Sequence, residues 1–140
     1  MLLLDAFRII DKQLQLAPNN AGTLANKGKL YVLTGNFSNA IPPLTLALSL
    51  TNIYAARLNR AVAYLRTGHL DAAAADYQEI LQAFPAAYSA CSGLVGTALQ
   101  MGDTNTAIRY CEQYLAKAGA DSDEAKVVAA RLKLLQQNRR

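Results

Sequence analysis

Three copies of one short pattern, spaced 33 and 34 residues apart, constrain this sequence more than any other feature. Each copy places apolar and small residues ahead of a glycine and an alanine five residues after it; the glycines are Gly35, Gly68 and Gly102. A period of this length is typical of repeat arrays, in which each unit buries its apolar side only by stacking on its neighbours. The period therefore predicts a chain built from successive, similar units.

Apolar and small residues recur at helical spacing on both sides of each glycine, which predicts two helices per unit. Around Gly35 these residues are Leu24, Gly28 and Tyr31 before it, and Ala40, Leu44 and Leu48 after it. A glycine between the two stripes can adopt the left-handed conformation that ends a helix. We therefore predict an all-α structure of about eight helices, paired as antiparallel hairpins that turn at the three glycines.

The order of residues in these units resembles the tetratricopeptide-repeat (TPR) family. Two successive motifs are matched by Gly28, Tyr31, Gly35, Phe37 and Ala40, and then by Tyr64, Gly68, Leu70, Ala73, Tyr77 and Pro85. The third copy is looser, with Ala98 where tyrosine is usual and Cys111 where an aromatic residue is usual. The resemblance covers nearly the whole chain and implies an α-solenoid of stacked hairpins, a TPR-like superhelix.

The repeats divide the chain into a predicted single domain, 1–140. It contains a half repeat (1–20), three repeats (21–53, 54–87 and 88–121) and a C-terminal capping helix (122–140). Asp121 and Glu124 have the spacing of a capping box that opens the last helix. Pro42 and Pro43 fall inside the helix expected at 37–50, and proline removes a backbone hydrogen bond there. We therefore expect that helix to start late or to bend near Ile41.

Composition limits the classes of function. The net charge of +4 is mild, so the chain lacks the dense basic clustering of a nucleic-acid-binding protein. No apolar run is long enough for a membrane span, and the first leucines are interrupted by Asp5 and Arg8, unlike a signal peptide. The two cysteines form neither a disulfide framework nor a CxxC metal site, so we expect a reducing, cytoplasmic setting, with a signal peptide outside this sequence left open as the alternative.

No catalytic, metal or cofactor site is predicted. His69, the only histidine, follows a turn glycine and is expected at the surface. Cys91 and Cys111 lie on predicted core faces, where they act as small buried apolar groups and not as reactive thiols. Gly93 and Gly96 lack the lysine and hydroxyl of a phosphate loop, so they are interpreted as a packing or groove feature. The chain is therefore not expected to be an enzyme.

The TPR resemblance implies that the first helix of each repeat lines a concave groove. None of the ten acidic residues falls within these helices, roughly 21–34, 55–67 and 87–101. The predicted groove residues are Lys29, Val32, Asn59, Val62, Arg66, Ser89, Gly93 and Gly96. We expect an acidic protein or peptide partner, with an ordinary solvated surface as the alternative. Asn59 matches one member of the clamp by which some TPR co-chaperones hold acidic chaperone tails, but the other positions do not match.

Two functions remain open from the sequence. The first is a scaffold or adaptor that holds a partner peptide or helix in its concave groove. The second is a structural segment of a longer solenoid, used for assembly or self-association without a free groove. In either case the apolar residues among 2–10 are predicted to be covered, by a second copy in a homodimer or by the rest of a longer solenoid.

Overall fold

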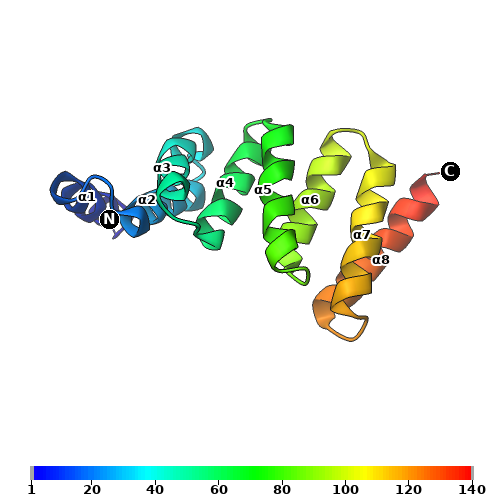
Figure 1. Cartoon of the computed structure of the whole chain (residues 1–140). Helices are drawn as coiled ribbons and strands as arrows, with labels where there is room; N and C mark the ends of the chain where they lie inside the picture. The colour runs from blue at the N-terminus through cyan, green and yellow to red at the C-terminus, as the bar shows by residue number, and fades with distance from the viewer. Residues whose placement is uncertain (1, 140) are drawn as a thin grey trace. The chain divides into compact units, whose positions relative to one another are not determined.

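Eight helices and no strand are found in residues 2–139, the part of the chain that the computed structural model describes (Figure 1). The helices are α1 (Leu2–Leu16), α2 (Ala21–Leu33), α3 (Phe37–Leu50), α4 (Tyr54–Arg66), α5 (Leu70–Ala83), α6 (Tyr88–Gln100), α7 (Thr104–Ala118) and α8 (Asp123–Asn138). The prediction of an all-α chain is confirmed. The helices form two compact units, the first ending at His69 and the second beginning at Leu70.

The three predicted turns share one backbone geometry. Gly35, Gly68 and Gly102 have positive φ angles of 76°, 81° and 75°. At the first turn, Asn36 N donates to Tyr31 O at 2.8 Å and Gly35 N donates to Val32 O at 3.1 Å. This pair of bonds is the Schellman motif, and equivalent pairs close the turns at the other two glycines. The glycines thus end α2, α4 and α6, as the sequence predicts.

In the first unit, α2 and α3 approach closely because α2 carries a glycine at the crossing. A Cβ added at Gly28 would lie 2.3 Å from Leu44 Cγ, and Leu44 is fully buried together with Ala40. The close approach therefore allows a leucine to fill the space that a side chain on α2 would occupy. Lys27 of α2 also forms an ion pair with α1, with its Nζ 2.8 Å from Asp11 Oδ1.

Helix α3 begins at Phe37 and runs through both prolines, so the expectation of a late start is wrong, whereas the alternative, a bend near Ile41, stays a prediction. The missing N–H groups of Pro42 and Pro43 would have bonded to the carbonyls of Ser38 and Asn39. Both residues are exposed in the first turn of the helix. Solvent can reach their carbonyls, which lowers the cost of the two prolines and lets the helix begin before them.

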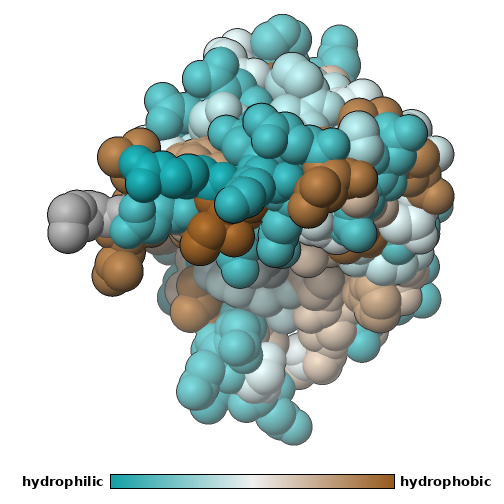
Figure 2. Space-filling view, turned by 90° about the vertical axis from the view of Figure 1, so that its left-hand side faces the viewer, coloured by the Kyte–Doolittle hydropathy of each residue, from teal (hydrophilic) through white to brown (hydrophobic). Residues whose placement is uncertain are grey.

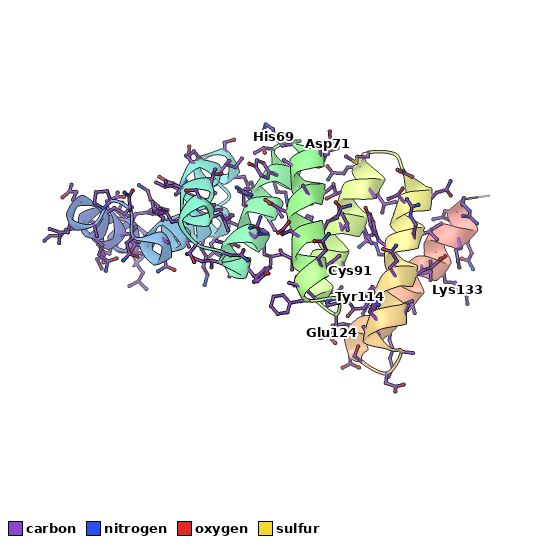
Figure 3. All side chains as sticks on the ribbon, viewed as in Figure 1. His69, Asp71, Cys91, Tyr114, Glu124 and Lys133 are labelled. Carbon is purple, nitrogen blue, oxygen red and sulfur yellow. The ribbon has the colours of Figure 1, made fainter. Side chains whose placement is uncertain are left out.

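The second unit packs α5, α6, α7 and α8 around a core that contains both cysteines. Cys91 on α6 and Cys111 on α7 are free thiols with at most 1% of their surface exposed. Figure 3 shows Cys91 close to Tyr114, which is buried in the same cluster. The predicted burial of the two thiols is confirmed.

The cap of α8 differs from the prediction by one residue. Ser122, not Asp121, is the N-cap, and its hydroxyl accepts a hydrogen bond from Ala125 N at 3.0 Å. Asp123 and Glu124 occupy the first turn, where negative charge favours the helix dipole. Serine and aspartate cap helices about equally well, so the sequence offers two adjacent candidates.

The two thiols should be unreactive in the folded protein. Burial raises the pKa of Cys91 to about 12, with a smaller contribution from neighbouring Cys111 and an opposing one from Arg131. Since the thiolate is the reactive form, a disulfide-exchange reagent should modify neither cysteine appreciably at pH 8. After unfolding in urea without reductant, two thiols per chain should react. The Cys91→Ala variant should give one, and an unfolded wild-type chain with none would contradict the prediction.

Candidate functional site

The first unit places five of the predicted groove residues on α2 and α4, two helices that contact each other. Lys29 and Arg66 are exposed, while Val32, Asn59 and Val62 are half-buried. The helical period explains this arrangement, because Leu24 and Gly28 on α2 and alanines on α4 occupy the buried side. These five residues are called the α2–α4 surface below.

Neither α2 nor α4 carries an acidic residue, but several of their cations are held by neighbours. Lys27 pairs with Asp11, and Arg57 Nη2 donates to Asn52 Oδ1 at 3.2 Å. Arg60 lies 5.6 Å from the centroid of the Tyr64 ring. These contacts direct three of the five positive charges toward their own unit.

Arg66 is held without losing its exposure. Its guanidinium carbon lies 5.5 Å from the centre of the Phe37 ring on α3, within the range of a cation–π contact. A ring face fixes the position of the guanidinium but leaves its N–H donors able to bind a carboxylate. Lys29 provides a second exposed positive charge on the neighbouring helix. The α2–α4 surface therefore presents two accessible cations and the amide of Asn59.

The three predicted groove residues on α6, in the second unit, lie in different environments. Ser89 is exposed, and a Cβ added at Gly96 would meet no atom within 4 Å. A Cβ at Gly93 would lie 2.2 Å from Tyr77 Cζ, so this glycine is a packing position against α5. Of the two roles that the sequence left open for the glycine pair, packing applies to Gly93 and an open surface to Gly96.

The residues considered for catalysis do not assemble into a reactive group. His69 is exposed at its turn, and its Nδ1 lies 2.8 Å from Thr67 Oγ1. The cysteines border a cavity of about 30 Å³ beside Arg131, which has room for water but not for a substrate. Within residues 2–139, no three histidine, cysteine or acidic side chains are grouped as a metal site would require.

Comparison with protein families identifies the repeat. Residues 64–132 match the family model of the tetratricopeptide repeat. This part of the chain belongs to the TPR family. The match covers the turns at Gly68 and Gly102 and begins at Tyr64, one of the motif residues on which the resemblance rests. Among curated proteins, none matches the chain significantly.

Several solved structures share the fold. The crystal structure of MamA superimposes on this chain with a TM-score of 0.76 and a sequence identity of 21%. The matched region spans 95% of this chain and 88% of the MamA chain. A TPR protein from Parabacteroides merdae ATCC 43184 is 23% identical with a TM-score of 0.80, and covers 97% of this chain. The chain spans 54% of that protein and 65% of a second MamA structure, MamA MSR-1 C2, which is 18% identical. These likenesses confirm the α-solenoid fold.

None of the helices between residues 2 and 139 combines the length and apolar character that crossing a membrane requires.

Sequence reasoning missed the contacts that decide how the candidate residues are presented. The Arg66–Phe37 contact joins two helices, and the Gly93–Tyr77 contact joins two others. A periodicity shows which face of a helix a residue occupies, but not which residue of the next helix it meets. The only available signal for the second contact was the pairing of a mid-helix glycine with a large residue on the preceding helix.

The two glycines of α6 should respond oppositely to the same substitution. Gly93→Ala should lower the free energy of unfolding by about 1–3 kcal/mol, because the added methyl group overlaps the buried ring of Tyr77. Gly96→Ala should raise it by about 0.5–1 kcal/mol, because alanine favours the helix and meets no neighbour. Urea denaturation followed by circular dichroism measures both. A stabilising Gly93→Ala change would show that Tyr77 does not constrain this position.

Proposed function

We propose that this chain is a scaffold or adaptor whose α2–α4 surface binds an extended, acidic segment of a partner protein. TPR repeats and the solenoid fold support a role in protein–protein interaction in general. The observation that carries the finer proposal is the charge of α2 and α4: neither has an acidic residue, and Lys29 and Arg66 remain exposed. The two helices contact each other, so both cations can act on one bound segment.

Each residue of the surface has a proposed role that follows from its chemistry. Lys29 and Arg66 attract carboxylates, which speeds association more than it strengthens the complex. The half-buried Asn59 can donate to and accept from a peptide backbone, as an amide side chain does. Val32 and Val62 offer apolar contact, and Ser89 and Gly96 are proposed as contacts of the same partner class on α6. A reducing, cytoplasmic setting belongs to this proposal and is supported by the free thiols.

Charge reversal tests the acidic-partner proposal. The Lys29→Glu/Arg66→Glu variant should bind a fluorescein-labelled peptide of alternating Glu and Gly, which has no large apolar side chain, about tenfold more weakly at low salt, because two attractive contacts become repulsive. Fluorescence anisotropy measures the affinity, and its salt dependence should flatten in the variant.

The matched control for that test is Lys126→Glu/Lys133→Glu. It changes the net charge equally at two exposed positions of α8, and it should keep most of the affinity. Equal weakening in both variants would mean that net charge alone attracts the peptide. Unchanged binding in the Lys29→Glu/Arg66→Glu variant would place recognition elsewhere.

Self-association is the second candidate, favoured by the exposed apolar residues of α1. Leu2, Leu3, Leu4 and Ile9 have 87%, 51%, 64% and 58% of their surface exposed. Figure 2 views the end of the chain that contains α1, and hydrophobic residues lie there among hydrophilic ones. Several large apolar residues exposed on one helix favour a contact site there. We propose that residues 2–10 pack against a second copy of the chain.

Sedimentation velocity tests the dimer. Wild-type protein should sediment as a dimer at micromolar concentration, and Leu2→Asp/Leu4→Asp should be monomeric because a buried carboxylate opposes apolar contact. Leu33→Asp changes an exposed leucine on α2 and should remain dimeric. Phe7 is not used, because its ring packs 4.9 Å from that of Tyr31 and its loss would disturb the fold. A monomeric wild-type protein would contradict the proposal.

A further inference from the structure

A pocket of about 760 Å³ opens within the second unit, on residues that the proposed function does not use. It is lined by α5 (Gln78, Leu81, Gln82), the following Pro85, α6 (Leu94) and α7 (Tyr110, Gln113, Tyr114, Lys117). Its size lies in the range of about 300–1,000 Å³ that is usual for ligand sites. The pocket is therefore large enough for more than one amino-acid residue.

The lining combines an apolar floor with a polar rim. Leu94 and Tyr114 are buried and Leu81 is half-buried, so the deeper wall is hydrophobic. Three glutamine side chains, Gln78, Gln82 and Gln113, are exposed around it. Such amides can both donate and accept hydrogen bonds, which is the pattern that an extended peptide backbone needs.

The rim of the pocket contains one hydrogen bond between helices and one positively charged side chain. Gln78 Nε2 donates to Tyr110 Oη at 2.7 Å, which links α5 to α7 and leaves the amide oxygen of Gln78 available. Lys117, in the last turn of α7, is the single charged side chain among the lining residues. The charge of the pocket is thus positive, without an acidic residue to cancel it.

From this chemistry we propose that the pocket binds an extended protein segment in which one acidic residue stands between apolar ones. The apolar side chains would lie on Leu81, Leu94 and Tyr114. The glutamines would bond to the backbone on either side, and Lys117 would pair with the carboxylate. This site is separate from the α2–α4 surface and does not rest on the function proposed there.

A pair of matched peptides tests the proposal. Acetyl-Leu-Glu-Leu-amide and acetyl-Leu-Gln-Leu-amide have nearly the same shape and differ in one charge. Each is titrated into ¹⁵N-labelled Lys29→Glu/Arg66→Glu protein, so that the α2–α4 surface does not compete. Amide resonances of Gln78, Gln82, Gln113 and Lys117 should shift with both peptides. The Glu peptide should bind about two- to fivefold more tightly, the gain expected of one exposed ion pair.

Two variants separate the charge from the cavity. Lys117→Gln should remove the preference for the Glu peptide, whereas Lys133→Gln, at an exposed position of α8, should leave it intact. Gln113→Trp should fill the pocket and reduce binding of both peptides at least tenfold, and circular dichroism checks that it stays folded. Because Gln113 is exposed, the change does not touch the core.

Three results would overturn the proposal. The first is equal affinity of the two peptides for the protein in which Lys117 is unchanged. The second is that amide resonances shift only in helices that do not line the pocket. The third is tighter binding of acetyl-Leu-Leu with a free C-terminal carboxylate, which would make a chain terminus the ligand and not an internal segment. The residue-resolved shifts also keep this outcome distinct from failure of the α2–α4 proposal.

Discussion

Close helix approach at small residues is the constraint on which both units depend. In the first unit Gly28 of α2 admits Leu44 of α3, and in the second Gly93 of α6 admits Tyr77 of α5. Both large residues are buried, with at most 1% of their surface exposed. Burial of each contributes about 1.5–3 kcal/mol, and a side chain in place of the glycine would force either of them to shift. These two interhelical contacts therefore depend on glycine, which has no Cβ, at positions 28 and 93.

This packing determines which residues remain for recognition. Because apolar and small residues fill the sides where helices meet, the cations of α2 and α4 are left to the half-buried and exposed positions. Aromatic rings then hold two of them, Arg60 over Tyr64 and Arg66 over Phe37. A cation–π contact orients the guanidinium without neutralising it, whereas the Lys27–Asp11 pair cancels a charge. The positive charge that the α2–α4 surface presents to a partner is thus smaller than the five basic residues of α2 and α4 would suggest.

The parts of the structure that were predictable from the sequence are the local ones. A turn at Gly35 needs only a glycine with positive φ and two backbone bonds, so the period in the sequence identifies it. The late start of α3 was mispredicted because the energetic cost of its two prolines depends on whether solvent reaches the carbonyls of Ser38 and Asn39. That exposure is a property of the assembled fold. The contact between Gly93 and Tyr77 depends on how α5 and α6 are aligned, which periodicity does not specify. The identity of the groove residues as a binding surface stays a prediction.

The pocket between α5 and α7 was beyond sequence reasoning for a related reason. In the sequence, the glutamines of its rim are ordinary exposed residues. They are recognised as one site only because the hydrogen bond from Gln78 to Tyr110, 32 residues later, brings α5 and α7 together. The chemistry of this pocket also differs from that of the α2–α4 surface. Two exposed cations act through long-range attraction, which salt screens over about 8–10 Å. An apolar floor with three neutral amides and one lysine at its rim acts mainly through burial and short-range hydrogen bonds. Binding at the pocket should therefore depend less on ionic strength than binding at the α2–α4 surface.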